Sequence, residues 1–187
     1  MTADKPLRAD ARRNRDALVA KAREVFAAGG YDLRFDDFAQ LAGVGTGTLY
    51  RHFPTREALA EAVYQEEITA ICARADELRA TLPGADALAA FLRGLVDYLF
   101  SNEGLARTLA AVMATRDEAM AEGGRAMHRA VADLLAAAVA DGGIRDDIGA
   151  AAVLMAMHGI FVAHGEPAGR DQAGEVLTLV LDGLRAR

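Results

Sequence analysis

The sequence predicts an all-α fold of about nine helices, and both its composition and its spacing favour this class. Alanine and leucine recur throughout, tryptophan is absent, and only 4 of the 187 residues are proline. Alanine and leucine favour helix, whereas the β-branched residues that favour strands are sparse. Apolar residues make up 52% of the chain, and many recur at spacings of three and four, the period of one helix face.

The N-terminal part of the chain is predicted to contain an arm followed by four helices. Three segments with helical spacing are closed by Gly29-Gly30, Gly43 and Pro54. Thr55 can cap a fourth helix, whose apolar pattern continues for more than six turns. The expected divisions are a flexible basic arm (1–13), a three-helix domain (14–56), a linking helix (55–81) and a C-terminal domain (82–187).

Pro83-Gly84 marks the clearest boundary in the chain, and five apolar segments with helical spacing follow it. The last two, around 148–162 and 176–184, are apolar most of the way round. A helix of this kind is buried on most sides, and the second subunit of a homodimer can cover one of them. A pair of central core helices in a monomer is the alternative. The residues expected at a dimer interface are Leu154, Phe161, Leu177, Leu181 and Leu184.

Charge is distributed unevenly along the chain. Residues 1–56 hold 10 Lys and Arg against 7 Asp and Glu, a net of +3. Because the whole chain holds 21 against 27, residues 57–187 hold 11 against 20, a net of −9. A basic N-terminal part favours a polyanionic partner, although ordinary scatter would also account for a net of +3.

Several classes of protein are disfavoured. The N-terminus lacks the apolar segment of a secretory signal, and the most apolar run, 150–163, is shorter than the roughly 20 residues that a membrane span needs. Cys72 is the only cysteine, which excludes an internal disulfide and fits a reducing cytoplasm. The histidines lack the spacing of metal ligands. We therefore expect a cytoplasmic protein with no metal, no cofactor and no membrane contact.

The stretch GVGTGTLYRHFPTR at 43–56 carries the most specific pattern. Ala39, Gly43 and Leu49 have the spacing of a helix-turn-helix. Ala39 is small where two helices cross, Gly43 can adopt the positive φ of the turn, and Leu49 and Phe53 can anchor the second helix. A phosphate-binding Walker loop is disfavoured because no lysine follows the glycines and no strand precedes them.

The second helix of a helix-turn-helix enters the major groove of DNA, and the residue types here suit that task. Thr46 and Thr48 can meet base edges, and Gly47 lets the backbone approach the duplex. Tyrosine, histidine and arginine side chains can donate to phosphates. The residues expected to contact DNA are Thr46, Gly47, Thr48, Tyr50, Arg51, His52 and Arg56.

Residues 14–63 resemble the DNA-binding domain of the TetR family of transcriptional regulators. The resemblance rests on VFAAGGYD, DDFAQLAGV and GTLYRHFPTREAL. It implies an all-α homodimer that binds a palindromic operator and acts as a repressor. An effector bound by the C-terminal domain would release the DNA. It also implies that Thr48, Tyr50, His52 and Arg56 contact DNA, mostly through its backbone.

The chain departs from the family pattern at two places in this domain. Phe35 stands where Thr or Ser usually leads the second helix, and Gly45-Thr46 stands where Ser and often a basic residue precede GTLY. The base preference of other members therefore does not transfer. Farther on, AFLRGLVDYLFSNEGLARTLAAV and DLLAAAVADGGIRDDI are similar to the subgroup with an SbtR-like C-terminal domain.

The C-terminal domain offers candidates for an effector pocket. Methionine adapts to irregular apolar shapes, and a few polar groups can orient a ligand, although the same residues also serve as ordinary core. A small, largely apolar effector is expected. The candidate residues are Leu95, Tyr98, Met113, Met127, His128, Met155 and His158. The alternative function is a helical ligand carrier or enzyme with a vestigial DNA-binding domain, but no nucleophile–base pair or paired carboxylates favour an enzyme.

Overall fold

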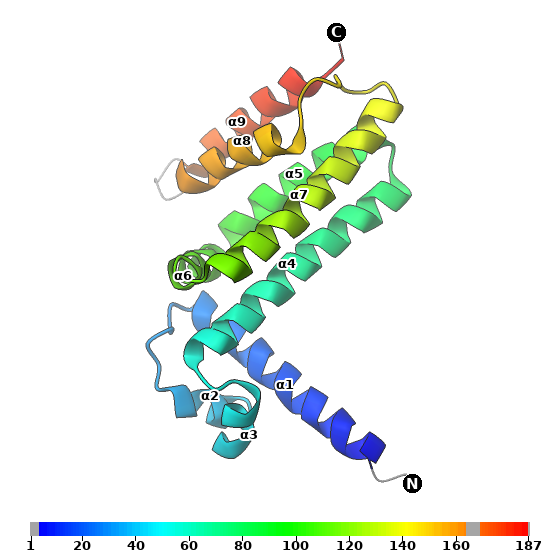
Figure 1. Cartoon of the computed structure of the whole chain (residues 1–187). Helices are drawn as coiled ribbons and strands as arrows, with labels where there is room; N and C mark the ends of the chain where they lie inside the picture. Colours follow the sequence, from blue (N-terminus) through cyan, green and yellow to red (C-terminus); the bar gives the residue numbers. More distant parts are fainter. Residues whose placement is uncertain (1–3, 164–168, 187) are drawn as a thin grey trace. The chain divides into compact units, whose positions relative to one another are not determined.

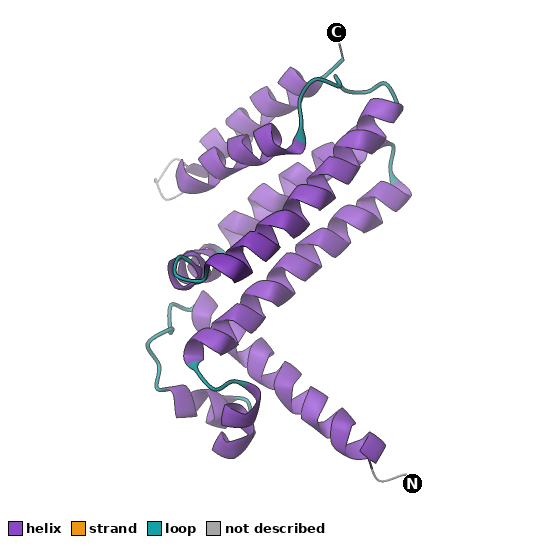
Figure 2. Ribbon diagram, viewed as in Figure 1, coloured by secondary structure: helices purple, strands orange, loops and turns teal. Residues whose placement is uncertain are grey.

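The computed structural model describes residues 4–163 and 169–186, and these form nine helices joined by short loops (Figures 1 and 2). The predicted all-α fold is confirmed. Within the described ranges, the one pairing of strand type is an antiparallel bridge between Ile144 and Arg185. The helices are α1 (Asp4–Ala27), α2 (Phe35–Leu41), α3 (Thr46–His52), α4 (Arg56–Thr81), α5 (Gly84–Ser101), α6 (Glu103–Met113), α7 (Asp117–Ala140), α8 (Ala150–Ala163) and α9 (Gly169–Leu184).

Two helix ends show how local sequence sets the fold. Gly43 adopts a φ of +69°, and the N–H of Val44 donates to the carbonyl of Ala39 at 2.9 Å, which closes α2. The side chain of Thr55 accepts a hydrogen bond from the N–H of Ala58 at 3.2 Å and so caps α4. Both features depend on residues within about one helical turn, so they could be predicted from the sequence.

The N-terminal residues differ from the expected flexible arm. Helix α1 begins at Asp4, so residues 4–13 are helical. Alanine, arginine and lysine in this segment have high helix propensity, and Pro6 falls in the first turn, where proline is tolerated. Extending a helix that has already nucleated costs little, so the buried later turns of α1 support the earlier ones.

The described chain divides into two compact units. The first unit runs to Glu67 and includes Glu103–Met120, and the second comprises Ile68–Asn102 and the chain from Ala121 onward. Helix α6 therefore packs with the N-terminal helices. Local periodicity could not reveal this, because an apolar face does not state which neighbour covers it.

The first unit has one apolar core to which α1, α2, α3, α4 and α6 all contribute. Phe26 of α1 and Phe38 of α2 meet edge to face with their ring centroids 5.7 Å apart. Leu105 of α6 is fully buried in the same core. The hydroxyl of Thr108 donates to the carbonyl of Phe26 at 3.2 Å, which fixes α6 against the end of α1.

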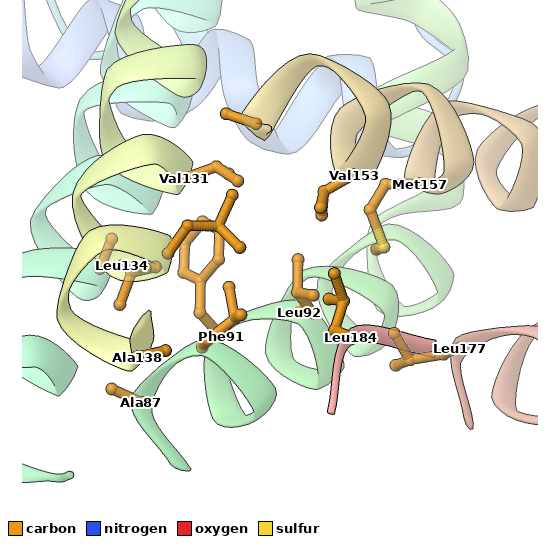
Figure 3. Close-up of a cluster of buried hydrophobic side chains, with 14 of the residues drawn as sticks. Ala87, Phe91, Leu92, Val131, Leu134, Ala138, Val153, Met157, Leu177 and Leu184 are labelled. Carbon is orange, nitrogen blue, oxygen red and sulfur yellow. The ribbon is translucent and has the colours of Figure 1, made fainter. Parts of the chain in front are cut away.

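The second unit packs α5, α7, α8 and α9 around the core shown in Figure 3. Phe91 of α5 points toward Val131 and Leu134 of α7, and all three side chains are buried. The N–H of Gly84 donates to a carboxylate oxygen of Asp141 at 2.6 Å, which ties the start of α5 to the end of α7. In the part of the chain that the structure describes, no helix combines the length and apolar character that a membrane crossing requires.

This core corrects the predicted dimer interface. Leu177 and Leu184 are only 4% and 3% exposed and lie in the core of the second unit, so they cannot meet another subunit. Leu154 and Leu181 are half-buried against that core. The side chain of Phe161 lies outside the described residues. The apolar side chains that α8 and α9 turn outward are Met155 (76% exposed), Val162 (67%), Val176 (42%) and Leu179 (71%).

Candidate nucleic-acid interface

Helices α2 and α3 form a helix-turn-helix packed against α1. Ala39 and Leu49 are fully buried and Phe53 is 5% exposed, so these three side chains hold the two helices together. Gly43 supplies the positive φ of the turn between them. The arrangement leaves one face of α3 without cover from the rest of the unit.

The uncovered face of α3 is largely polar. Thr46, Gly47 and Arg51 are exposed, and Tyr50 is 49% exposed. Two residues predicted to contact DNA, Thr48 and His52, are half-buried, so less of their surface is available. A short helix with small polar groups at its first turn and an arginine near its last suits contact with base edges and phosphates.

The side chain of Tyr50 packs against the first turn of α2. Its ring stands edge-on to that of Phe35, with the centroids 5.4 Å apart and an interplanar angle of 81°. Three causes raise the pKa of Tyr50. Hydrogen bonding with the Asp36 carboxylate has the largest effect, partial burial comes next, and the negative charge of the same carboxylate has the smallest. The sequence analysis assigned no role to Asp36, which lies fourteen residues before Tyr50.

Arg56 makes contacts within the protein, and its predicted phosphate contact stays a prediction. One of its terminal nitrogens donates to the carbonyl of Leu33 at 2.5 Å, and the guanidinium lies 5.3 Å from the ring centroid of Tyr31. Its Nε is buried and lacks a hydrogen-bond partner among the described residues. Arg56 thus fastens the loop between α1 and α2 to the start of α4. Tyr31, which had no role in the sequence analysis, completes this contact.

The caps of α2 and α3 also refine the sequence analysis. The N-cap of α2 is Arg34, one residue before the expected Phe35, and it makes no side-chain cap hydrogen bond. The N-cap of α3 is Gly45, which has no side chain to offer. Cap positions depend on backbone angles, which the sequence indicates only to within a residue or two.

The seven residues proposed for an effector pocket do not share one environment. Met113 is fully buried in the core of the first unit, whereas Leu95 and Met127 are half-buried against the core of the second. Tyr98 is also half-buried, but His128, His158 and Met155 are exposed. A cavity of about 440 Å³ in the second unit lies between the start of α5 and the end of α9, and none of the seven lines it.

Histidine, cysteine and acidic side chains are the candidates for metal and thiol chemistry. Over residues 4–163 and 169–186, no group of three histidine, cysteine or acidic side chains is placed to hold a metal ion. Burial, and after it the negative charge of Asp76, raises the pKa of the Cys72 thiol, while Arg129 lowers it to a lesser extent. A thiol with a raised pKa is a poor nucleophile at neutral pH.

The geometry therefore defines a helix-turn-helix DNA-binding protein with a second, helical unit. Comparison with known proteins then identifies the family. Residues 18–63 match the family model described as bacterial regulatory proteins, tetR family, and residues 83–186 match that of the transcriptional regulator SbtR-like C-terminal domain. The chain belongs to the TetR family of transcriptional regulators, and its N-terminal domain is the DNA-binding domain of that family.

Solved structures agree with this assignment. A TetR transcriptional regulator from Streptomyces coelicolor is 42% identical, with 91% of this chain and 98% of that chain covered and a TM-score of 0.72. A TetR regulatory protein from Mycobacterium vanbaalenii is 31% identical, with 97% and 100% covered and a TM-score of 0.74. FadR from Bacillus subtilis, solved with stearoyl-CoA, is 17% identical and shares the fold, with 90% and 98% covered and a TM-score of 0.70. The comparison with curated protein sequences gives no match.

Proposed function

We propose that this chain is a cytoplasmic, homodimeric repressor that binds a palindromic operator and leaves it when a small molecule binds. The observation that carries the proposal is the uncovered polar face of α3, which the helix-turn-helix presents on the first unit. Thr46 and Thr48 meet base edges, while Tyr50 and Arg51 contact phosphates. The proposal includes no catalytic step, because the matched proteins are transcriptional regulators.

The dimer contact in this proposal is the outward apolar face of α8 and α9. Met155, Val162 and Leu179 are each more than two-thirds exposed, and Val176 is 42% exposed. Exposed apolar side chains gathered on two neighbouring helices commonly mark a protein interface. Two helices from each chain would form a four-helix contact with twofold symmetry, which matches the symmetry of a palindrome.

The effector in this proposal is a small, largely apolar compound bound by the second unit. Half-buried Leu95, Tyr98 and Met127 supply apolar surface with one hydroxyl, which suits such a ligand. The stearoyl-CoA bound by the FadR structure is an example of an apolar chain held by this fold. Native mass spectrometry of the purified dimer tests the idea. A retained small molecule that lowers DNA affinity when added back is expected, and a ligand that leaves DNA affinity unchanged would contradict release.

DNA binding is tested directly by selecting duplexes from random sequence with the folded dimer and footprinting the best of them. We expect two protected half-sites whose centres lie one helical turn, about 10 base pairs, or a small multiple of it apart. A folded dimer that protects no site even at low salt would refute the proposal.

Two variants of α3 separate base contact from phosphate contact. Arg51→Ala should weaken binding to all duplexes alike and reduce the slope of log affinity against log salt by about 1. Thr46→Ala should instead change the order of preference among operators altered at one position and leave that slope unchanged. An equal loss on every duplex for Thr46→Ala would show that this residue does not contact bases.

A further inference from the structure

The cavity of about 440 Å³ in the second unit lies where the start of α5, the loop after α7 and the end of α9 meet. Backbone hydrogen bonds join that loop to α9: the N–H of Arg145 donates to the carbonyl of Leu184 at 2.9 Å, and the N–H of Ala186 donates to that of Gly143 at 3.4 Å. On the other side, a Cβ added at Gly143 would lie 2.7 Å from the Cβ of Ala85 in α5. The walls of the cavity are therefore fixed by close packing. Its volume falls within the roughly 300–1,000 Å³ of small-molecule sites.

The lining of this cavity combines charged and aliphatic side chains. Three are charged, namely Asp86, Arg93 and Arg185. Arg185 forms an ion pair with Asp182 at 3.4 Å, but both side chains are more than half exposed, so this pair is weakly held. Arg93 makes no ion pair with any other residue that the structure describes. The aliphatic lining residues are Leu88, Ile144, Leu181 and Leu184.

The acidic and basic groups that α5 contributes lie far apart. Asp86 is in the first turn of α5, where the positive end of the helix dipole favours a carboxylate. Arg93 follows seven residues later, which is about two turns or roughly 10 Å along the helix axis. The small side chain of Ala89 stands between them on the same face of the helix. Asp86 therefore leaves the charge of Arg93 available to a ligand.

We propose that this cavity binds a small molecule that carries a carboxylate on an apolar body. The planar guanidinium of Arg93 can donate two parallel hydrogen bonds to a carboxylate, and the aliphatic side chains cover the apolar body. Two arginines against one aspartate favour an anion over a cation. The site is additional to the effector contact in the proposed function, because Leu95, Tyr98 and Met127 do not line this cavity.

The test titrates the full-length protein, without DNA, with octanoate and with its neutral counterpart octanamide. Amide resonances of Gly142 and Gly143 report binding by nuclear magnetic resonance, because both residues line the cavity. Octanoate should shift both resonances and bind about fivefold tighter than octanamide, since Arg93 is exposed and water screens part of the attraction. Equal binding of the two compounds, or shifts that leave both glycines unmoved, would overturn the proposal. Tighter binding of octylammonium than of octanoate would also overturn it, since Asp86 would then be the contact.

Arg93→Gln isolates the charge contact, and Arg125→Gln is its matched control. Arg125 is an exposed arginine of α7 that does not line the cavity. In Arg93→Gln the preference for octanoate over octanamide should disappear while octanamide binds as before, because only the charge contact is lost. Arg125→Gln should keep the fivefold preference. The proposal fails if Arg93→Gln keeps it too, or if both variants lose it equally.

Ala89→Leu tests the cavity itself without changing its charge. The larger side chain occupies part of the space between Asp86 and Arg93, so octanoate and octanamide should both bind more weakly and to the same extent. Circular dichroism checks that the variant is folded, and folded Ala89→Leu with the octanoate affinity of the wild type would place the ligand elsewhere. Because every measurement is made without DNA, a wild type that selects no duplex would refute the proposed function and leave this site standing.

Discussion

The outward apolar face of α8 and α9 predicts that Leu179→Glu converts the dimer into a monomer. Leu179 of α9 is 71% exposed in the single chain, and Met155 of α8 is 76% exposed. The opposite faces of both helices are occupied by the core of the second unit. The substitution therefore leaves the fold of one chain intact and acts on the contact between chains.

The size of the effect follows from the exposed area and the symmetry. Full burial of a leucine side chain is worth about 2 kcal/mol, and Leu179 has 71% of its surface left to bury, so each copy contributes about 1.5 kcal/mol. A twofold interface uses every residue twice, so the dimer loses about 3 kcal/mol, or about 150-fold in the dissociation constant. Burying two glutamate charges adds to this loss.

Sedimentation velocity over a range of concentrations measures the dissociation constant of the dimer, and circular dichroism checks that each variant is folded. Leu82→Glu is the matched control, because Leu82 is an apolar residue 40% exposed just after α4 and outside the proposed contact. It should leave the dimer unchanged. The reasoning fails if folded Leu179→Glu dimerises as tightly as the wild type, or if Leu82→Glu dissociates equally.

Three further predictions concern stability and reactivity. Arg56→Ala should lower the free energy of unfolding by about 1–3 kcal/mol, because it removes the contacts with the loop before α2. Arg51 is exposed, so Arg51→Ala should leave this free energy unchanged. Urea unfolding measures both variants. Gly104→Ala should destabilise the protein by about 1–3 kcal/mol, since the added Cβ would lie 2.2 Å from a carbonyl oxygen of α1. The Cβ added by Gly94→Ala meets open space, so this variant should be neutral or stabilising. Thermal unfolding measures both. At pH 8, Cys72 should be alkylated more slowly in the folded than in the urea-unfolded protein, because its raised pKa leaves less thiolate. The alkylation rate of the folded protein should also keep rising to higher pH. Equal pH profiles for the two states would contradict this prediction.

The candidate site shows where sequence patterns suffice. The helix-turn-helix was predictable because its determinants are close together: a small residue, a glycine with positive φ and an apolar anchor within eleven positions. The side-chain contacts of Arg56 and Tyr50 could not be predicted in the same way. An arginine in the first turn of a helix can meet a phosphate or a carbonyl of a neighbouring loop, and only the path of that loop decides between them.

The C-terminal half shows the same limit on a larger scale. Its helices could be placed from their apolar spacing, but the two faces of α9 are both apolar, and periodicity cannot say which of them meets the core. The structure buries the face of Leu177 and Leu184 and exposes that of Leu179. Likewise, Met113 lies in the core of the first unit because α6 packs against α1, a contact between residues about eighty positions apart.

The sequence by itself determined the all-α class, the helix-turn-helix and the family, because helix propensity, turn glycines and motif spacing act over a few residues. The tertiary structure decided which apolar faces are buried in a core, which unit contains α6, and whether a charged side chain faces solvent or contacts a neighbour. These outcomes depend on packing between distant segments, where burial of apolar surface outweighs any local preference.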